Sequence, residues 1–137
     1  LATGGFRRVL PDEAGPAPQQ TKQLLLCTGK VYYDLLEQRE ELGRNDVAIV
    51  RLEQLYPFPH ALLHETLAAY PQNLEVRWVQ EEPANMGAWP FLRRNFGETM
   101  YGRRLTVVAR PESASPGTGS FNAHKIEQAR LLEQAFA

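Results

Sequence analysis

Short apolar runs alternate with amphipathic stretches along most of this chain. Four such runs occupy residues 24–27, 47–50, 76–79 and 105–109. Short runs with little polar interruption are typical of strands that are covered on both faces. The runs therefore predict four buried strands, each followed by a stretch with helical periodicity.

The stretches between the runs predict helices over residues 31–42, 59–70, 86–101 and 122–136. We expect the first three to end at Gly43, Pro71 and Gly102, and the third to be capped by Asn85. The predicted inner faces are Val31, Leu35 and Leu42; Leu63, Leu67 and Tyr70; Trp89, Leu92 and Phe96; and Ile126, Ala129, Leu132 and Phe136.

Strand and helix thus alternate four times, and each connection between strands carries a helix. Strands joined in this way are parallel, with right-handed crossovers. The pattern predicts a three-layer α/β/α sandwich over residues 21–137. Residues 1–20 form a separate lead-in, in which residues 6–10 are a candidate edge strand and a proline-rich stretch follows as an exposed connector.

Composition narrows the class of protein. A chain of 137 residues corresponds to one domain, and 43% apolar with 23% charged residues is ordinary for a globular protein. The net charge of −1 predicts no general attraction to nucleic acid or to an anionic membrane, and no apolar run is long enough to span one. Cys27 is the single cysteine, expected to be a packing residue in a reducing compartment.

Candidate ligand-binding residues lie outside the carboxyl ends of the predicted strands, which is where ligands bind in open α/β sheets. Thr28, Gly29 and Lys30 follow the first strand, and the loop after the last strand carries Arg110, with Ser113 and Ser115. Backbone N–H groups, hydroxyls and two cations suit a phosphate or carboxylate. The alternatives are a lysine that pairs with an acidic loop residue and a loop that packs on another domain.

The other polar residues give weaker evidence for a functional site. Glu81 and Glu82 form a carboxylate pair that closes the third strand, but neighbouring strand residues point to opposite faces. His60 and His64 share a helix face and lack the third ligand of a zinc site. His124 is expected at the surface. No convincing nucleophile or acid–base pair emerges, so we expect no catalytic residue here.

Four segments in order carry a resemblance to a known family. Residues 27–35 (CTGKVYYDL) and 46–60 (DVAIVRLEQLYPFPH) are similar to consecutive segments of 2-oxoglutarate dehydrogenase. Residues 80–89 resemble its QEEPxNxGAW motif, with Met86 where glutamine is common. Residues 110–119 resemble GRPxSASPxxG, with Ala109 in place of the first glycine.

The resemblance implies the C-terminal domain of the thiamine-dependent, decarboxylating first component, which belongs to the transketolase-like group. It further implies a mostly parallel, five-stranded sheet with one antiparallel strand, supplied by residues 6–10. The chain begins at Leu1 and is expected to be a piece of a longer polypeptide.

The resemblance also implies a setting. The full enzyme decarboxylates 2-oxoglutarate on thiamine diphosphate with magnesium and passes the succinyl group to a lipoyl arm of the second, succinyltransferase component. Preceding domains hold the cofactor at a homodimer interface, so this chain is expected to bind neither cofactor nor metal. Its expected role is structural, dimerising or regulatory, in the cytoplasm or the mitochondrial matrix. A relative acting on 2-oxoadipate would share these motifs.

Regulation in the family involves acetyl-CoA or nucleotides. The anion site predicted from the residues at the carboxyl edge is therefore expected to take a regulatory, phosphate-bearing ligand; its candidate residues are Thr28, Gly29, Lys30, Arg110, Ser113 and Ser115. The alternative function is a stand-alone α/β module that binds a phosphate-bearing ligand such as a nucleotide or CoA.

Aromatic residues exceed what one small core must hold. We therefore expect some of the following rings to face another domain or subunit: Tyr32, Tyr56, Phe58, Trp89 and Phe91.

Overall fold

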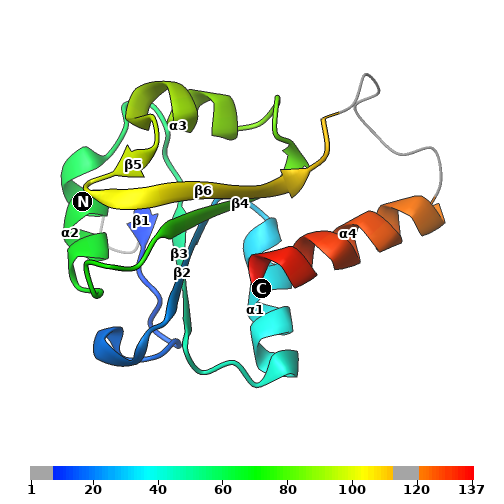
Figure 1. Cartoon of the computed structure of the whole chain (residues 1–137), viewed down its shortest axis with the longest axis horizontal. Helices are drawn as coiled ribbons and strands as arrows, with labels where there is room; N and C mark the ends of the chain where they lie inside the picture. Colours follow the sequence, from blue (N-terminus) through cyan, green and yellow to red (C-terminus); the bar gives the residue numbers. More distant parts are fainter. Residues whose placement is uncertain (1–7, 113–120) are drawn as a thin grey trace, which may run out of the picture.

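Helices lie on both faces of a central sheet in the computed structural model, which describes residues 8–112 and 121–137 (Figure 1). The strands are β1 (Val9–Leu10), β2 (Gln23–Cys27), β3 (Val47–Leu52), β4 (Val76–Pro83), β5 (Thr99–Met100) and β6 (Arg103–Arg110). The helices are α1 (Val31–Leu42), α2 (His60–Ala68), α3 (Trp89–Phe96) and α4 (Phe121–Ala135), with a 3-10 turn, η1, at Pro18–Gln20. Within the described ranges, none of the helices has the length and apolar content needed to cross a bilayer.

The strand order is β1-β3-β2-β4-β6-β5. The four strands β3, β2, β4 and β6 are parallel, and β1 lies antiparallel to β3, with Val9 opposite Leu52. The predicted α/β sandwich is confirmed. The antiparallel edge strand is confirmed in its described part, Val9–Leu10.

The predicted count of five strands is wrong, because β5 adds a second antiparallel strand beside β6. The sequence-based helix over 86–101 is too long. It ends instead at Gly97, whose φ of 70° is left-handed. Tyr101 (φ 53°) and Gly102 (φ 86°) then form the two-residue turn that joins β5 to β6. Two consecutive positive φ values match the twist of a tight hairpin, so residues 99–100 return along β6.

Two apolar cores lie on opposite faces of the sheet. Side chains of α2 and α3, including Leu63, Leu67, Trp89 and Leu92, pack with alternate strand residues such as Trp78. On the other face Val31 and Leu35 of α1, with Leu131 and Ala135 of α4, pack with Leu25, Ile49 and Val108. The alternation of β-strand side chains thus divides apolar runs between two cores. This is why the runs show no polar face.

The predicted inner face of α4 is wrong at Ile126, which is 58% exposed, and at Ala129, which is exposed. The prediction is confirmed at Phe136, which is buried, and at Leu132, which packs against the core, and Leu131 and Ala135 are buried beside them. Figure 1 shows the first half of α4 extending beyond the end of the sheet, so this half has no strand beneath it. Leu42, at the end of α1, is likewise exposed rather than inward-facing.

The carboxyl end of β4 is shaped by the buried side-chain amide of Gln80. Its oxygen accepts hydrogen bonds from Trp78 Nε1 and Trp89 N, both at 2.9 Å. Its nitrogen donates to the carbonyls of Pro83 (2.9 Å) and Met86 (2.8 Å). This amide holds the loop in place, so β4 continues through Pro83 and α3 begins at Trp89. The prediction that Glu81 and Glu82 close the third strand agrees with its end at Pro83, whereas the predicted helix cap at Asn85 is wrong, because Ala88 takes that position.

The proline-rich lead-in is tied to the domain by a buried ion pair. The Arg39 guanidinium binds both Asp12 carboxylate oxygens and also donates to the Val47 carbonyl at 3.0 Å. Asp12 additionally accepts the N–H of Ile49 at 2.7 Å, and its side chain is only 2% exposed. The prediction of an exposed connector is thus wrong at this point, because a charge inside a proline-rich stretch finds its partner only in the folded chain.

Candidate functional site

The carboxyl edge of the parallel sheet carries the predicted site residues. Lys30 precedes α1, and its Nζ lies 2.8 and 3.1 Å from the two carboxylate oxygens of Glu81 on β4. The hydrogen bond to Glu81 raises the pKa of Lys30 above its ordinary value, against smaller opposing effects of burial and of Arg110. Because β2 and β4 are neighbours, the end of one strand places its lysine beside the acid of the other. The alternative of a lysine paired with an acidic residue is thus confirmed.

Arg110 ends β6 and reaches α4. Its guanidinium donates to Gln128 Oε1 at 2.7 Å and lies 3.2 Å from His124 Nδ1 and 3.5 Å from Glu127 Oε1. The Nε of Arg110 is buried and has no hydrogen-bond partner within the described ranges. The arginine is therefore held by the first turns of α4 with one donor left over. His124 is exposed, as expected.

Gln128 joins the two predicted cations into one network. Its Nε2 donates to Glu81 Oε1 at 3.1 Å and to Asp34 Oδ2 at 2.8 Å, while its oxygen accepts from Arg110. Lys30 and Arg110 therefore do converge on one edge, but through carboxylates that already balance their charge. An incoming anion would have to compete with these carboxylates.

The remaining predicted members divide into two groups. Gly29 has a left-handed φ of 76°, and its N–H points toward Glu53 Oε2 at 3.5 Å, while Thr28 is half-buried beside it. Ser113 and Ser115 lie outside the described residues, so their part in an anion site stays a prediction.

A second cluster at this edge went unnoticed in the sequence. The Arg51 guanidinium lies 4.8 Å from the centre of the Tyr32 ring and 5.3 Å from that of Tyr33, and its Nε donates to Glu53 at 2.7 Å. Stacking of this kind orients the guanidinium, whose charge is paired with the Glu53 carboxylate. Nearby, Tyr56 is 89% exposed and precedes a cis proline. An arginine directly after an apolar run, with two tyrosines opening the previous helix, was the available signal.

His60 and His64 both contact Tyr101 rather than each other. His60 Nδ1 shares a 2.8 Å hydrogen bond with the Tyr101 hydroxyl, and the His64 ring stacks on the Tyr101 ring at 4.8 Å. Burial raises the pKa of Tyr101 to about 12. Within the described ranges, no group of three or more His, Cys, Asp or Glu side chains is arranged to hold a metal ion.

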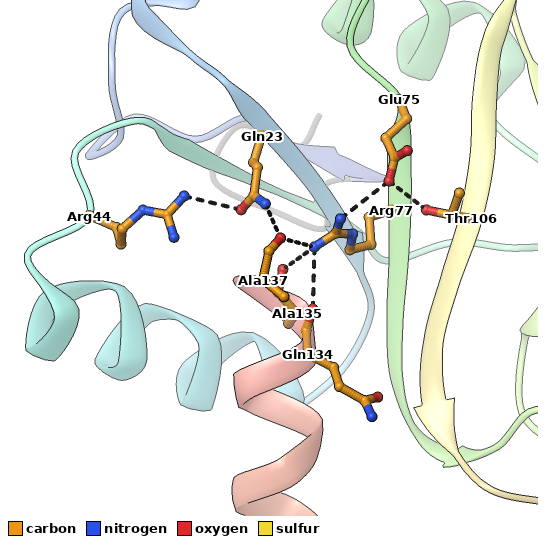
Figure 2. A network of polar contacts seen from close by, with 8 residues as sticks. All are labelled: Gln23, Arg44, Glu75, Arg77, Thr106, Gln134, Ala135 and Ala137. Atoms are coloured by element: carbon orange, nitrogen blue, oxygen red, sulfur yellow. Dashed lines mark hydrogen bonds and ion pairs between the residues drawn. The ribbon is translucent and has the colours of Figure 1, made fainter.

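The opposite, amino edge of the sheet holds a network that the sequence did not predict. Figure 2 shows Arg77 of β4 reaching the last turn of α4, where its Nη1 donates to the carbonyls of Gln134, Ala135 and Ala137 at 2.9–3.2 Å. The side chain of Gln23 also donates to the Ala137 carbonyl. Carbonyls at a helix end lack intrahelical partners and carry partial negative charge, so an arginine is a suitable cap.

Comparison with known proteins adds the family. Residues 1–136 match the family described as "2-oxoglutarate dehydrogenase C-terminal". The chain is 46% identical to a "2-oxoglutarate dehydrogenase E1 component" of Cupriavidus necator and 43% identical to one of Azotobacter vinelandii, over 100% and 99% of its length. It is 40% identical, over 96% of its length, to a "2-oxoglutarate dehydrogenase, mitochondrial" of Caenorhabditis elegans. It spans only 14%, 15% and 13% of these three relatives.

Proposed function

Because the chain belongs to the 2-oxoglutarate dehydrogenase C-terminal family, we propose that it is the C-terminal α/β unit of a longer enzyme. This parent enzyme is a thiamine-dependent first component that decarboxylates 2-oxoglutarate oxidatively and passes the succinyl group to a lipoyl arm. The observation that carries the proposal is the family match over residues 1–136. That match favours this function over a stand-alone ligand-binding module.

The role within the parent enzyme is structural. The motif residues whose contacts are described serve the fold: Gln80 holds the loop before α3, and Lys30 binds Glu81 across two strands. Tyr56 is 89% exposed on a loop whose Gln54 side chain donates to the Pro57 carbonyl at 2.7 Å. An exposed aromatic ring on a braced loop suits contact with the preceding domains or with a second subunit. Of the other predicted interface rings, Trp89 is buried in this domain.

The cofactor belongs elsewhere in the parent enzyme. Magnesium and thiamine diphosphate bind as a unit, and the resemblance to the family implies that the domains before this one hold them. We therefore place both in the preceding domains. The further partners are the succinyltransferase component and a second copy of the enzyme, in the bacterial cytoplasm or the mitochondrial matrix.

The test compares three proteins: the complete parent enzyme, the same enzyme without the region that corresponds to this chain, and this chain alone. Carbon dioxide release from 2-oxoglutarate is measured for each, and dimerisation is followed by analytical ultracentrifugation. The complete enzyme is expected to turn over, the shortened enzyme to lose dimerisation and most activity, and the chain alone to be inactive. Turnover by the chain alone, or full activity and dimerisation of the shortened enzyme, would contradict the proposal.

A regulatory anion site remains a proposal of its own. Lys30 and Arg110 lie at one edge and share a polar network, and the Lys30 side chain is 80% exposed, within reach of a phosphate-bearing effector such as acetyl-CoA or a nucleotide. Arg110→Ala in the parent enzyme is expected to raise the acetyl-CoA concentration for half-maximal activation about tenfold. Arg94→Ala, an exposed change on α3, is the control. Equal loss of basal and activated turnover would show that Arg110 holds the fold instead.

A further inference from the structure

The outer edge of β6 is only partly paired. β5 covers its first residues, with Met100 opposite Arg103 and Thr99 opposite Arg104, and the Leu105 N–H donates to the Glu98 carbonyl at 2.9 Å. β5 is two residues long, whereas β6 has eight. The second half of this edge therefore extends past the strand that covers it.

The backbone groups on that edge are identified by the alternation along a strand. The Leu105 N–H points away from β4, so the N–H and C=O groups of Val107 and Ala109 do so as well. The Arg110 carbonyl, by contrast, accepts from Ala84 N on the β4 side. No hydrogen bond between described residues reaches these outward groups of Val107 and Ala109. Two donors and two acceptors in a row are a template for an added strand.

Two hollows flank this open edge. One, of about 380 Å³, lies beside the first half of the edge and is lined by Trp89, Arg93, Glu98, Leu105 and Val107 among others. A smaller one, of about 130 Å³, lies beside the second half, between β6 and α4, and is lined by Ala109, Arg110 and Arg130 among others. Strand addition pairs main-chain groups and seats alternate side chains in neighbouring pockets. The edge of β6 has both features.

Charge decides what the edge accepts. The two hollows are lined by four arginines (Arg93, Arg104, Arg110 and Arg130) and two glutamates (Glu98 and Glu127). β6 itself contains no acidic residue, and three of the four arginines, Arg93, Arg104 and Arg130, are exposed. We propose that the free edge of β6 binds an extended segment of a partner protein in which acidic residues alternate with β-branched apolar ones. A second copy of β6 is a poor occupant, because antiparallel pairing about Val107 would bring Arg110 of each copy to the Arg104 position of the other, which is also positively charged and is already covered by β5.

The probe is a fluorescent seven-residue peptide of alternating glutamate and valine, with blocked ends, titrated onto the chain and followed by anisotropy. The control peptides carry lysine in place of glutamate, or N-methyl groups that remove the pairing amides. We expect binding of the glutamate peptide alone, with slower hydrogen exchange at the Val107 and Ala109 amides. Absence of binding up to about 1 mM, or binding without that protection, would overturn the proposal.

Matched variants of the chain separate edge pairing from folding. Val107→Pro removes an outward N–H and leaves the β4 ladder intact, and it is expected to weaken peptide binding at least tenfold. Val107→Ala trims the same side chain but keeps the N–H, so it should bind as the original chain does. If Val107→Pro does not fold by circular dichroism, Ala109→Pro replaces it. Equal binding by the proline variant, or β6 self-pairing without peptide, contradicts the proposal.

Discussion

Cys27 shows how burial sets the chemistry of a single residue. It ends β2 with no exposed surface, and burial raises the pKa of its thiol to about 12. A thiolate is the reactive form of cysteine, so this thiol is inert at neutral pH. The prediction of a packing residue is confirmed, and the sequence supported it because the residue ends an apolar run.

The raised pKa predicts a loss of stability at high pH. Below about pH 9 the thiol is protonated in both states, whereas above it the unfolded chain gains a thiolate that the folded chain cannot form. Because of Cys27, the free energy of unfolding should therefore decrease by roughly 1 kcal/mol between about pH 9 and about pH 10. Urea unfolding at both pH values would measure it, with Cys27→Ala as the reference that lacks this dependence. Identical pH profiles for the two proteins would contradict the prediction.

At the scale of elements, the lead-in is held by a short strand that pairs with β3 and by a buried ion pair. β1 contributes only two residues to the sheet, and η1 only three. Between them, Asp12 inserts its carboxylate beside Arg39 of α1 and the backbone of β3. The pair connects the lead-in, a helix and a strand that are separate in sequence.

Asp12→Ala is expected to destabilise the chain by about 3–5 kcal/mol, because Arg39 is then buried without its carboxylate. Residues 11–20 should become sensitive to limited proteolysis before the rest of the chain. Glu13→Ala, an exposed neighbour, is the matched control and should behave like the original chain.

A double variant, Asp12→Ala with Arg39→Met, separates the charge from the contact. It should recover part of the lost stability, since the unpaired charge is gone. Equal unfolding midpoints for Asp12→Ala and Glu13→Ala would show that the ion pair contributes nothing.

At the scale of the whole molecule, α4 ties the two edges of the sheet together. Its first turns bind Arg110 at the carboxyl edge, and its last turn binds Arg77 at the amino edge (Figure 2). Among the α4 side chains whose burial is described, the buried apolar ones, Leu131 and Ala135, lie in its second half. Polar contacts at both ends thus position a helix whose first half lies beyond the sheet.

Arg77→Ala is expected to loosen the end of α4 and to cost about 2 kcal/mol of stability, because three carbonyls lose a charged donor. Hydrogen exchange at residues 134–137 should become at least tenfold faster, while exchange in β2 should accelerate only as far as the loss of global stability requires. Arg94→Ala, on the surface of α3, should change neither. Unaltered exchange at residues 134–137 in Arg77→Ala would show that apolar packing alone holds this end.

The sequence by itself determined the layers, the parallel strands and the positions of most elements. Apolar runs of four or five residues separated by helical stretches leave few other folds, because each buried strand needs cover on both faces. It also placed Lys30 and Arg110 at one edge, since parallel strands end together. These conclusions rest on local patterns, that is, on residues that lie close together in the sequence.

Only the tertiary structure decided the rest, because it depends on partners distant in sequence. The hairpin at Tyr101–Gly102 needed backbone angles, and the exposed face of Ile126 needed the length of the sheet beneath α4. Arg103 is buried, and its guanidinium donates to carbonyls at the end of α2, including those of Leu67 and Tyr70. The residues next to Arg103 in the sequence do not predict that contact. Polar side chains bind whatever the fold brings within hydrogen-bonding distance, so their partners become defined only when the chain is folded.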